Sequence, residues 1–105
     1  KVYAEAESLL REVLSFREKT AATFWATHHT QSLLGVALLG QEKYAAAEPL
    51  LLQGYEGLRL REAAIPSEVK CYPIHALKRL VQLYDAWGKP DEAAKWRKKL
   101  VKGRE

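Results

Sequence analysis

A segment that occurs twice, and a third time in weakened form, places the strongest constraint on the fold of this chain. The sequence YAEAESLL at Tyr3–Leu10 returns 41 positions later as YAAAEPLL at Tyr44–Leu51, and a shorter echo, PDEAA, begins after a further 46 positions at Pro90. Repeats at this spacing are typical of supersecondary units stacked side by side. Such units pack mainly on their neighbours and present an extended surface. The repeat therefore predicts a binding scaffold and leaves the ligand open.

The hydrophobic pattern predicts an all-α fold in a single domain that covers residues 1–105. Apolar residues recur at steps of three and four, and no segment shows the alternation of a strand. Thr23 is expected to cap the second helix, and Gly88 with Pro90 marks the boundary before the last helix. Short connections place neighbouring helices antiparallel. The five expected helices span approximately residues 2–18, 24–39, 44–63, 73–87 and 90–102.

The repeated unit resembles the tetratricopeptide repeat (TPR), in which paired antiparallel helices carry small and large residues at fixed offsets. The matching residues are Tyr3, Ala6 and Leu10 in the first unit, Leu34, Gly35, Leu38, Tyr44, Ala47 and Leu51 in the middle unit, and Leu80, Tyr84, Gly88, Pro90 and Ala93 in the last. The resemblance covers nearly the whole chain, as about two and a half repeats. It implies helix pairs stacked as a right-handed superhelix.

Two departures from the common repeat refine the resemblance. The spacings of 41 and 46 residues exceed the usual length of roughly 34, so the unit is similar to the longer repeats of kinesin light chains. The stretch from Leu33 to Leu51 is more similar still to the C-terminal repeat arrays of some bacterial serine/threonine protein kinases. Arg97 stands where Leu10 and Leu51 stand in the earlier units, which indicates that no further repeat packs there.

In this family the first helix of each pair lines a concave groove, and the resemblance implies which residues would line it here. They are His29, Ser32 and Val36 from the middle unit, and His75, Lys78 and Gln82 from the last. The two histidines are equivalent across the 46-residue spacing. The set implies a mildly basic channel for an acidic or extended peptide segment. The expected function is protein–protein interaction, with no cofactor and no small-molecule substrate.

Two alternative functions are compatible with the same pattern. In the first, the repeats are a structural spacer or docking domain of a larger protein, such as a serine/threonine kinase, and the groove is empty. In the second, the basic C-terminal helix contacts nucleic acid, because residues 95–105 carry six Lys and Arg and one acid, whereas the rest carries eleven basic and twelve acidic residues. A nucleic-acid-binding domain usually spreads its basic residues along one face, so the charge pattern disfavours this second alternative.

The residues that could carry chemistry do not form a catalytic or metal-binding pattern. His28 and His29 are adjacent, so their side chains diverge on a helix instead of converging on one ion. Cys71 and His75 are four residues apart, but Pro73 disfavours a regular helix through that stretch. Neither a third metal ligand nor an oxyanion-binding turn accompanies them. We therefore expect no enzymatic activity and no metal.

The remaining sequence features concern location and assembly. A single cysteine cannot form an internal disulfide, which favours a reducing compartment such as the cytoplasm. No apolar run approaches the ~20 residues that a membrane-spanning helix needs. The chain begins inside a repeat element and contains no methionine, so we interpret it as a piece of a longer protein. The exposed N-terminal edge of such a piece predicts self-association at that end.

Overall fold

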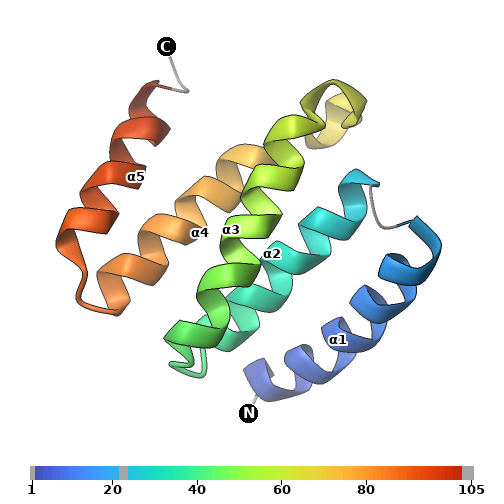
Figure 1. Ribbon diagram of the computed structural model, residues 1–105, viewed down its shortest axis with the longest axis horizontal. Coiled ribbons are helices and arrows are strands. Elements are labelled where there is room, and N and C mark those ends of the chain that lie inside the picture. Colours follow the sequence, from blue (N-terminus) through green and yellow to red (C-terminus); the bar gives the residue numbers. More distant parts are fainter. Residues whose placement is uncertain (1, 22–23, 103–105) are drawn as a thin grey trace.

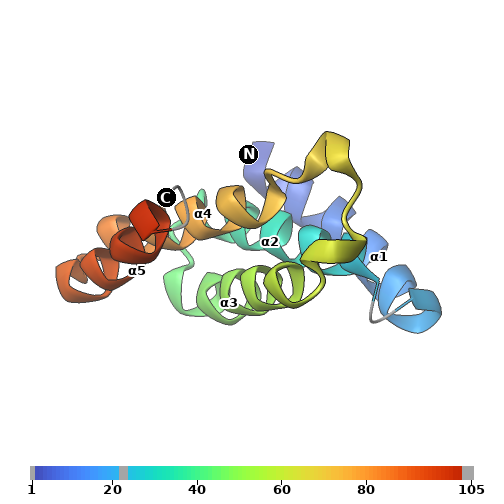
Figure 2. The same cartoon turned by 90° about the horizontal axis from the view of Figure 1, so that it is seen from above.

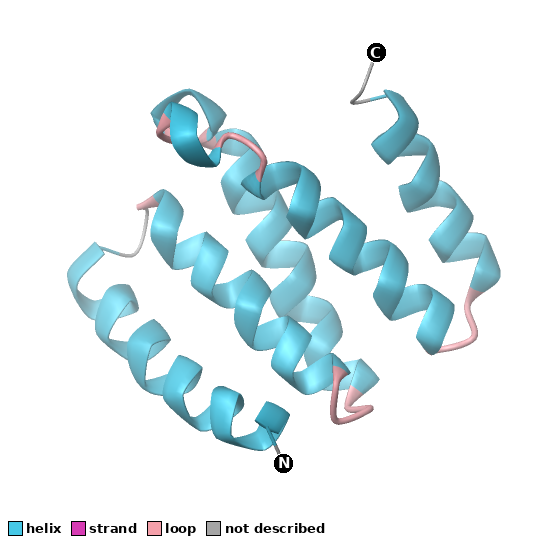
Figure 3. Ribbon diagram, turned by 180° about the vertical axis from the view of Figure 1, so that it is seen from behind, coloured by secondary structure: helices cyan, strands magenta, loops and turns pink. Residues whose placement is uncertain are grey.

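The computed structural model describes residues 2–21 and 24–102; Thr23, the predicted cap of the second helix, lies outside them. Over these residues the fold is all-helical and contains no strand, which confirms the all-α part of the prediction. Two short 3₁₀ turns, Glu62–Ala64 and Ser67–Val69, connect the third helix to the fourth. The five α-helices are α1 (Val2–Ala21), α2 (Trp25–Leu39), α3 (Tyr44–Leu60), α4 (Tyr72–Ala86) and α5 (Pro90–Lys102) (Figure 1; Figure 3).

Two helix ends differ from the prediction by three residues, each for a local reason, whereas the other ends agree to within one residue. Helix α1 continues past residue 18 to Ala21. There Thr20 turns its hydroxyl back to the carbonyl of Phe16 at 2.9 Å, so this polar residue is accommodated within the helix. Helix α3 ends at Leu60, three residues before the expected end, and the chain continues in 3₁₀ turns. Ile65 follows them and is buried, which anchors this connection in the core.

The centre of the molecule is the contact between α2 and α3, the most extensive between any two helices. A Cβ atom at Gly35 of α2 would lie only 2.6 Å from Cγ of Leu51 on α3, and a Cβ atom at Gly54 of α3 would lie 2.9 Å from Ser32 of α2. Because these glycines have no side chain, the two helices can approach closely. Burial of one leucine contributes roughly 1.5–3 kcal/mol. The fully buried leucines are Leu34, Leu38, Leu51, Leu58, Leu80 and Leu83.

The turns inside the two helical hairpins, α2–α3 and α4–α5, have the same backbone geometry. The residue with positive φ is Glu42 (61°) in the first turn and Gly88 (75°) in the second, 46 positions apart. In each turn the amide of the following lysine, Lys43 or Lys89, donates to the carbonyl five residues earlier, at 3.0 and 2.9 Å. This is the hydrogen bond that closes a helix with a left-handed residue. The 46-residue sequence spacing therefore corresponds to a repeated structural unit.

The two copies of the repeated segment begin α1 and α3, and their tyrosines lie in similar surroundings. Tyr3 lies against Gly40 at the end of α2. Tyr44 stacks on Trp87 at the end of α4, with a centroid distance of 5.9 Å. Tyr3 therefore links the start of α1 to the end of α2, and Tyr44 links the start of α3 to the end of α4. This agreement supports the pairing of helices that the repeat predicts.

The helices form a flattened body of 37 × 34 × 19 Å, seen edge-on in Figure 2, with α1 at one end and α5 at the other. The stacking of helix pairs into a right-handed superhelix stays a prediction. None of the described helices combines the length and apolar character needed to cross a bilayer.

Helix α1 exposes an apolar stripe on the face that its counterpart α3 buries. Leu9 and Phe16 are each 67% exposed, and Val13 is 39% exposed. The residues 41 positions after Val13 and Phe16 are Gly54 and Gly57 of α3, and both lie against α2. In α1 the corresponding face is open to solvent. The predicted self-association at the N-terminal edge thus has an apolar surface available to it, and it stays a prediction.

Candidate functional site

The two histidines that the sequence repeat relates lie on neighbouring helices. His29 comes from α2 and His75 from the first turns of α4, and these two helices contact each other directly. Tyr72 begins α4 and lays its ring flat on the His29 imidazole, with a centroid distance of 3.9 Å and an interplanar angle of 8°. Pro73 lies in the first turn of α4, where a backbone nitrogen needs no hydrogen-bond partner within the helix and the φ angle of proline is favourable. It therefore favours a helix that begins here, next to Tyr72.

A guanidinium group joins α4 to α2 one turn further on. Arg79 is half-buried, and its Nη1 donates to the Oγ of Ser32 at 3.0 Å. Ser32 has no exposed surface, because α3 approaches it closely at Gly54. Among the residues that the structure describes, no carboxylate lies within ion-pair distance of Arg79. Burial lowers the pKa of Arg79, but an arginine side chain keeps its charge at neutral pH. The site therefore holds a partly desolvated and uncompensated positive charge.

Other positively charged groups besides Arg79 lie close to His29. The pKa of His29 is lowered to about 4, first by burial and then by the positive charges of Arg79, His75 and Arg17. His29 is therefore neutral at pH 7. Its Nδ1 and the Nε of Arg17 are buried and have no hydrogen-bond partner among the described residues. We call the six residues at this place the α2–α4 seam: Arg17, His29, Ser32, Tyr72, His75 and Arg79.

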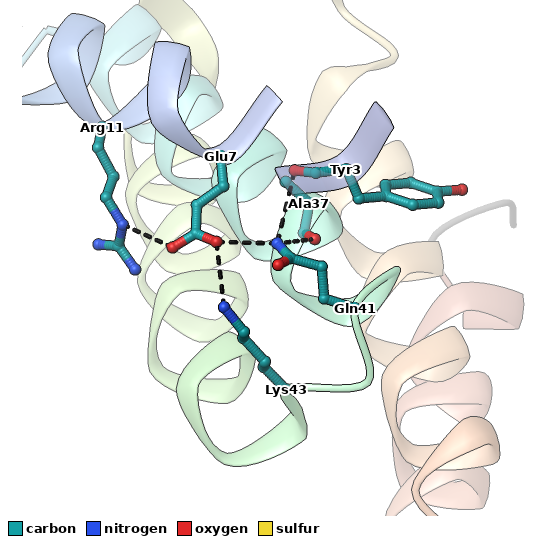
Figure 4. A network of polar contacts seen from close by, with 6 residues as sticks. All are labelled: Tyr3, Glu7, Arg11, Ala37, Gln41 and Lys43. Carbon is teal, nitrogen blue, oxygen red and sulfur yellow. Dashed lines mark hydrogen bonds and ion pairs between the residues drawn. The ribbon is translucent and has the colours of Figure 1, made fainter. Parts of the chain in front are cut away.

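In a second polar cluster, between α1 and the turn after α2, the charged side chain is compensated by its neighbours (Figure 4). Glu7 accepts from Gln41 Nε2 and Arg11 Nε, both at 2.8 Å, and from Lys43 Nζ at 3.4 Å. The hydrogen bonds from Gln41 and Arg11, with the charge of Lys43, lower the pKa of Glu7 to about 2. This cluster is internally satisfied and ties α1 to the hairpin. The α2–α4 seam, by contrast, retains donors without acceptors.

The structure brings only part of the predicted groove together. His29, Ser32 and His75 meet in the seam, but Ser32 is completely buried and can act only through Arg79. Val36 is half-buried further along α2. Lys78 and Gln82 are exposed on α4, and in the described part of the chain no hydrogen bond joins either to the seam.

Sequence analysis missed three residues of the seam. Tyr72 and Arg79 lie three residues before and four residues after His75, so a helical projection of α4 places all three on one face. That signal was present in the sequence. Arg17 comes from the end of α1, and its approach to α2 depends on how the separate helices pack. No local pattern could have revealed it.

The basic residues of α5 are partly engaged within the molecule. Arg97 pairs with Asp85 of α4 at 2.7 Å. Lys95 and Lys99 lie over the ring of Trp96, at 5.5 and 4.9 Å from its centroid. Over the described ranges, no three His, Cys, Asp or Glu residues are grouped so that they could hold a metal ion. Comparison with known proteins added no relationship: no family model, curated protein or solved structure matched the chain.

Proposed function

We propose that this chain is a TPR-like protein-interaction module that binds an acidic, extended segment of a partner protein at the α2–α4 seam. The observation that carries the proposal is the half-buried Arg79, which is bonded to Ser32 and lacks a carboxylate partner among the described residues. A charge withdrawn from water without a counter-ion is unfavourable. A carboxylate supplied by a partner would compensate it.

The rest of the seam suits the same ligand. Arg17 adds a second positive charge with an unpaired buried Nε, and neutral His29 offers an unpaired Nδ1. Hydrogen bonds from a guanidinium to a carboxylate are among the stronger polar contacts, with a net worth of about 1.5–3 kcal/mol each. The exposed Lys78 on the same helix extends the positive surface beyond the seam. Its position is suited to long-range attraction more than to a fixed contact.

The test is a binding measurement with a library of short acidic peptides, read by fluorescence anisotropy. Arg79→Gln should weaken the best ligand about tenfold or more, because it removes the charge-assisted hydrogen bonds. Lys78→Glu should weaken it less, through repulsion at longer range. Lys98→Gln is the matched control, since Lys98 is an exposed basic residue on α5. Equal affinities for all four proteins would refute binding at the seam.

The two alternative functions predict different results in the same assay. If the chain is a spacer or docking domain of a larger protein with an empty groove, no acidic peptide binds and Lys78→Glu has no effect. If the basic helix α5 contacts nucleic acid, binding to DNA or RNA should fall steeply with added salt, because several counterions are released. In that case Lys98→Gln, and not Arg79→Gln, should change the affinity.

A further inference from the structure

A pocket with a volume of about 250 Å³ lies on the other side of α4, between the end of α3, the start of α4 and α5. Its floor is apolar. Leu77 and Tyr55 are 5% and 8% exposed, Pro73 is buried, and Ile74 is half-buried. Trp96 of α5 meets Tyr55 edge to face, with a centroid distance of 5.7 Å and an angle of 84°. The floor is therefore held in place by packing on both neighbouring helices.

The rim of this pocket is mainly basic. Arg59, Lys70 and Lys99 line it, together with one acid, Glu62. Arg59 is paired with Glu56 outside the pocket at 2.8 Å. The other two cations have no carboxylate partner among the described residues: Lys70 Nζ donates to the backbone carbonyl of Glu62 at 2.6 Å, and Lys99 lies over the Trp96 ring. Arg59, Lys70 and Lys99 carry three positive charges, and Glu56 and Glu62 carry two negative charges. The net charge of these five side chains is therefore +1.

Two further features favour an anion at this place. Tyr55 lines the pocket, and in the described part of the chain its hydroxyl has no hydrogen-bond partner. Burial raises the pKa of Tyr55, so its hydroxyl stays a proton donor at neutral pH. The first turn of α4 contains no acidic residue and no side-chain cap. Its helix dipole therefore adds positive potential beside Ile74.

We propose that this pocket binds an organic anion: one carboxylate or phosphate group attached to an apolar body the size of a single aromatic side chain. The apolar body would lie on Leu77, Ile74 and Tyr55, and the anion would lie at the rim between Lys99 and Lys70. The volume agrees with this size, because a cavity of about 150 Å³ already accommodates a benzene ring. The site is separate from the α2–α4 seam, so it does not depend on the function proposed there.

The experiment is an NMR titration of the full chain, in which amide shifts at Tyr55, Ile74 and Leu77 report the pocket. The probes are benzoate and phenyl phosphate, with benzamide as the neutral counterpart of benzoate and inorganic phosphate as the anion without an apolar body. The two aromatic anions should give saturable shifts with dissociation constants on the order of 1–10 mM, as expected for ligands of this size. Benzamide and inorganic phosphate should bind at least about tenfold more weakly.

Three variants locate the site. Lys99→Gln should weaken benzoate about three- to tenfold, because it removes a charge at the rim. Ile74→Phe should abolish the shifts by filling the pocket while leaving an apolar residue in place. Lys98→Gln is the control, since Lys98 neighbours Lys99 in sequence but lines a different hollow, with Ala94 and Val101; it should change affinity less than about twofold.

Several outcomes would overturn the proposal. One is that neither benzoate nor phenyl phosphate gives a saturable shift. Others are equal binding of benzamide and benzoate, or binding of inorganic phosphate as tight as that of phenyl phosphate. Shifts confined to His29 and His75 would place the anion in the seam instead. An equal effect of Lys98→Gln and Lys99→Gln would show diffuse attraction to α5 without a pocket. Binding of benzoate alone or of phenyl phosphate alone would support the pocket and identify the preferred anion.

Discussion

The close contact between α2 and α3 can be tested at Gly54, where the backbone of one helix lies against the other. A Cβ atom at Gly54 would lie 2.9 Å from three atoms of α2: the carbonyl oxygen of His28, and the Cβ and backbone nitrogen of Ser32. Real Cβ contacts essentially never fall below 3.0 Å. Two of these three atoms are backbone atoms and cannot rotate away. The substitution Gly54→Ala must therefore displace α2 relative to α3.

The expected change in stability is the difference between two opposing effects. Alanine is better than glycine inside a helix by about 1 kcal/mol. Overpacking a tight contact typically costs about 1–3 kcal/mol, and the upper part of this range applies because backbone atoms are involved. Gly54→Ala should therefore destabilise the protein by about 1–2 kcal/mol. At Gly57 a Cβ atom would overlap the ring of His28, whose Nδ1 is hydrogen-bonded to Gln31 at 3.0 Å. Gly57→Ala should therefore also destabilise the protein, because the ring can move only by giving up this hydrogen bond.

Urea unfolding followed by circular dichroism measures these differences. A loss of 1–2 kcal/mol should lower the urea midpoint by roughly 1 M. Gln53 is exposed on α3, so the pair Gln53→Ala and Gln53→Gly measures the intrinsic preference for alanine in this helix. Suppose that Gly54→Ala raised the free energy of unfolding by as much as Gln53→Ala exceeds Gln53→Gly. The close packing of α2 on α3 would then be refuted.

Four further predictions follow from particular contacts. Gly35→Leu should cost about 1–3 kcal/mol, because it overpacks the contact with Leu51; a neutral result in urea would contradict the helix pairing. The pKa of Glu7 is lowered to about 2 from an ordinary 4.5, so its contribution to stability is complete above pH 4.5 and is lost as pH falls toward 2. Glu7→Gln should thus be less stable than wild type at pH 7 and should converge with it near pH 2; a constant difference across this range would argue against the network. The pKa of His29 is lowered to about 4, so the unfolded chain takes up its proton first and stability should decrease as pH falls from 6.5 to 4. His29→Gln should remove that pH dependence, and an NMR titration midpoint near 6.5 would contradict the buried position. Light scattering should detect reversible self-association through the apolar stripe of α1, and Phe16→Glu should abolish it; a strictly monomeric wild type at high concentration would exclude it.

Much of the fold was predictable because its boundaries depend on local chemistry. Gly88 adopts a positive φ, and Pro90 opens the following helix, as their sequence pattern predicted. The small residues at Gly35 and Ala47 are buried, as expected of a close helix contact. The end of α3 was less predictable. Its last turn is replaced by a 3₁₀ connection anchored by Ile65, and that burial depends on the tertiary packing and not on the local sequence.

The candidate site was predictable only in part, for a physical reason. The 46-residue spacing relates His29 to His75, and the structure places them on two helices that contact each other. The spacing could not show that Ser32 is withdrawn from solvent, because this depends on how closely Gly54 approaches from α3. The uncompensated charge of Arg79 is likewise a property of the packed structure, since the sequence gives no indication of which carboxylates lie within reach.

The central functional claim is that the α2–α4 seam accepts carboxylates from a partner. The most direct measurement is an NMR titration of the imidazole signals of His29 and His75 with an acidic peptide, and with a matched peptide in which every acid is replaced by its amide. The account predicts saturable shifts of both imidazoles with the acidic peptide alone, and their loss in Arg79→Gln but not in Lys98→Gln. Equal responses to the two peptides, or shifts confined to α5, would contradict it.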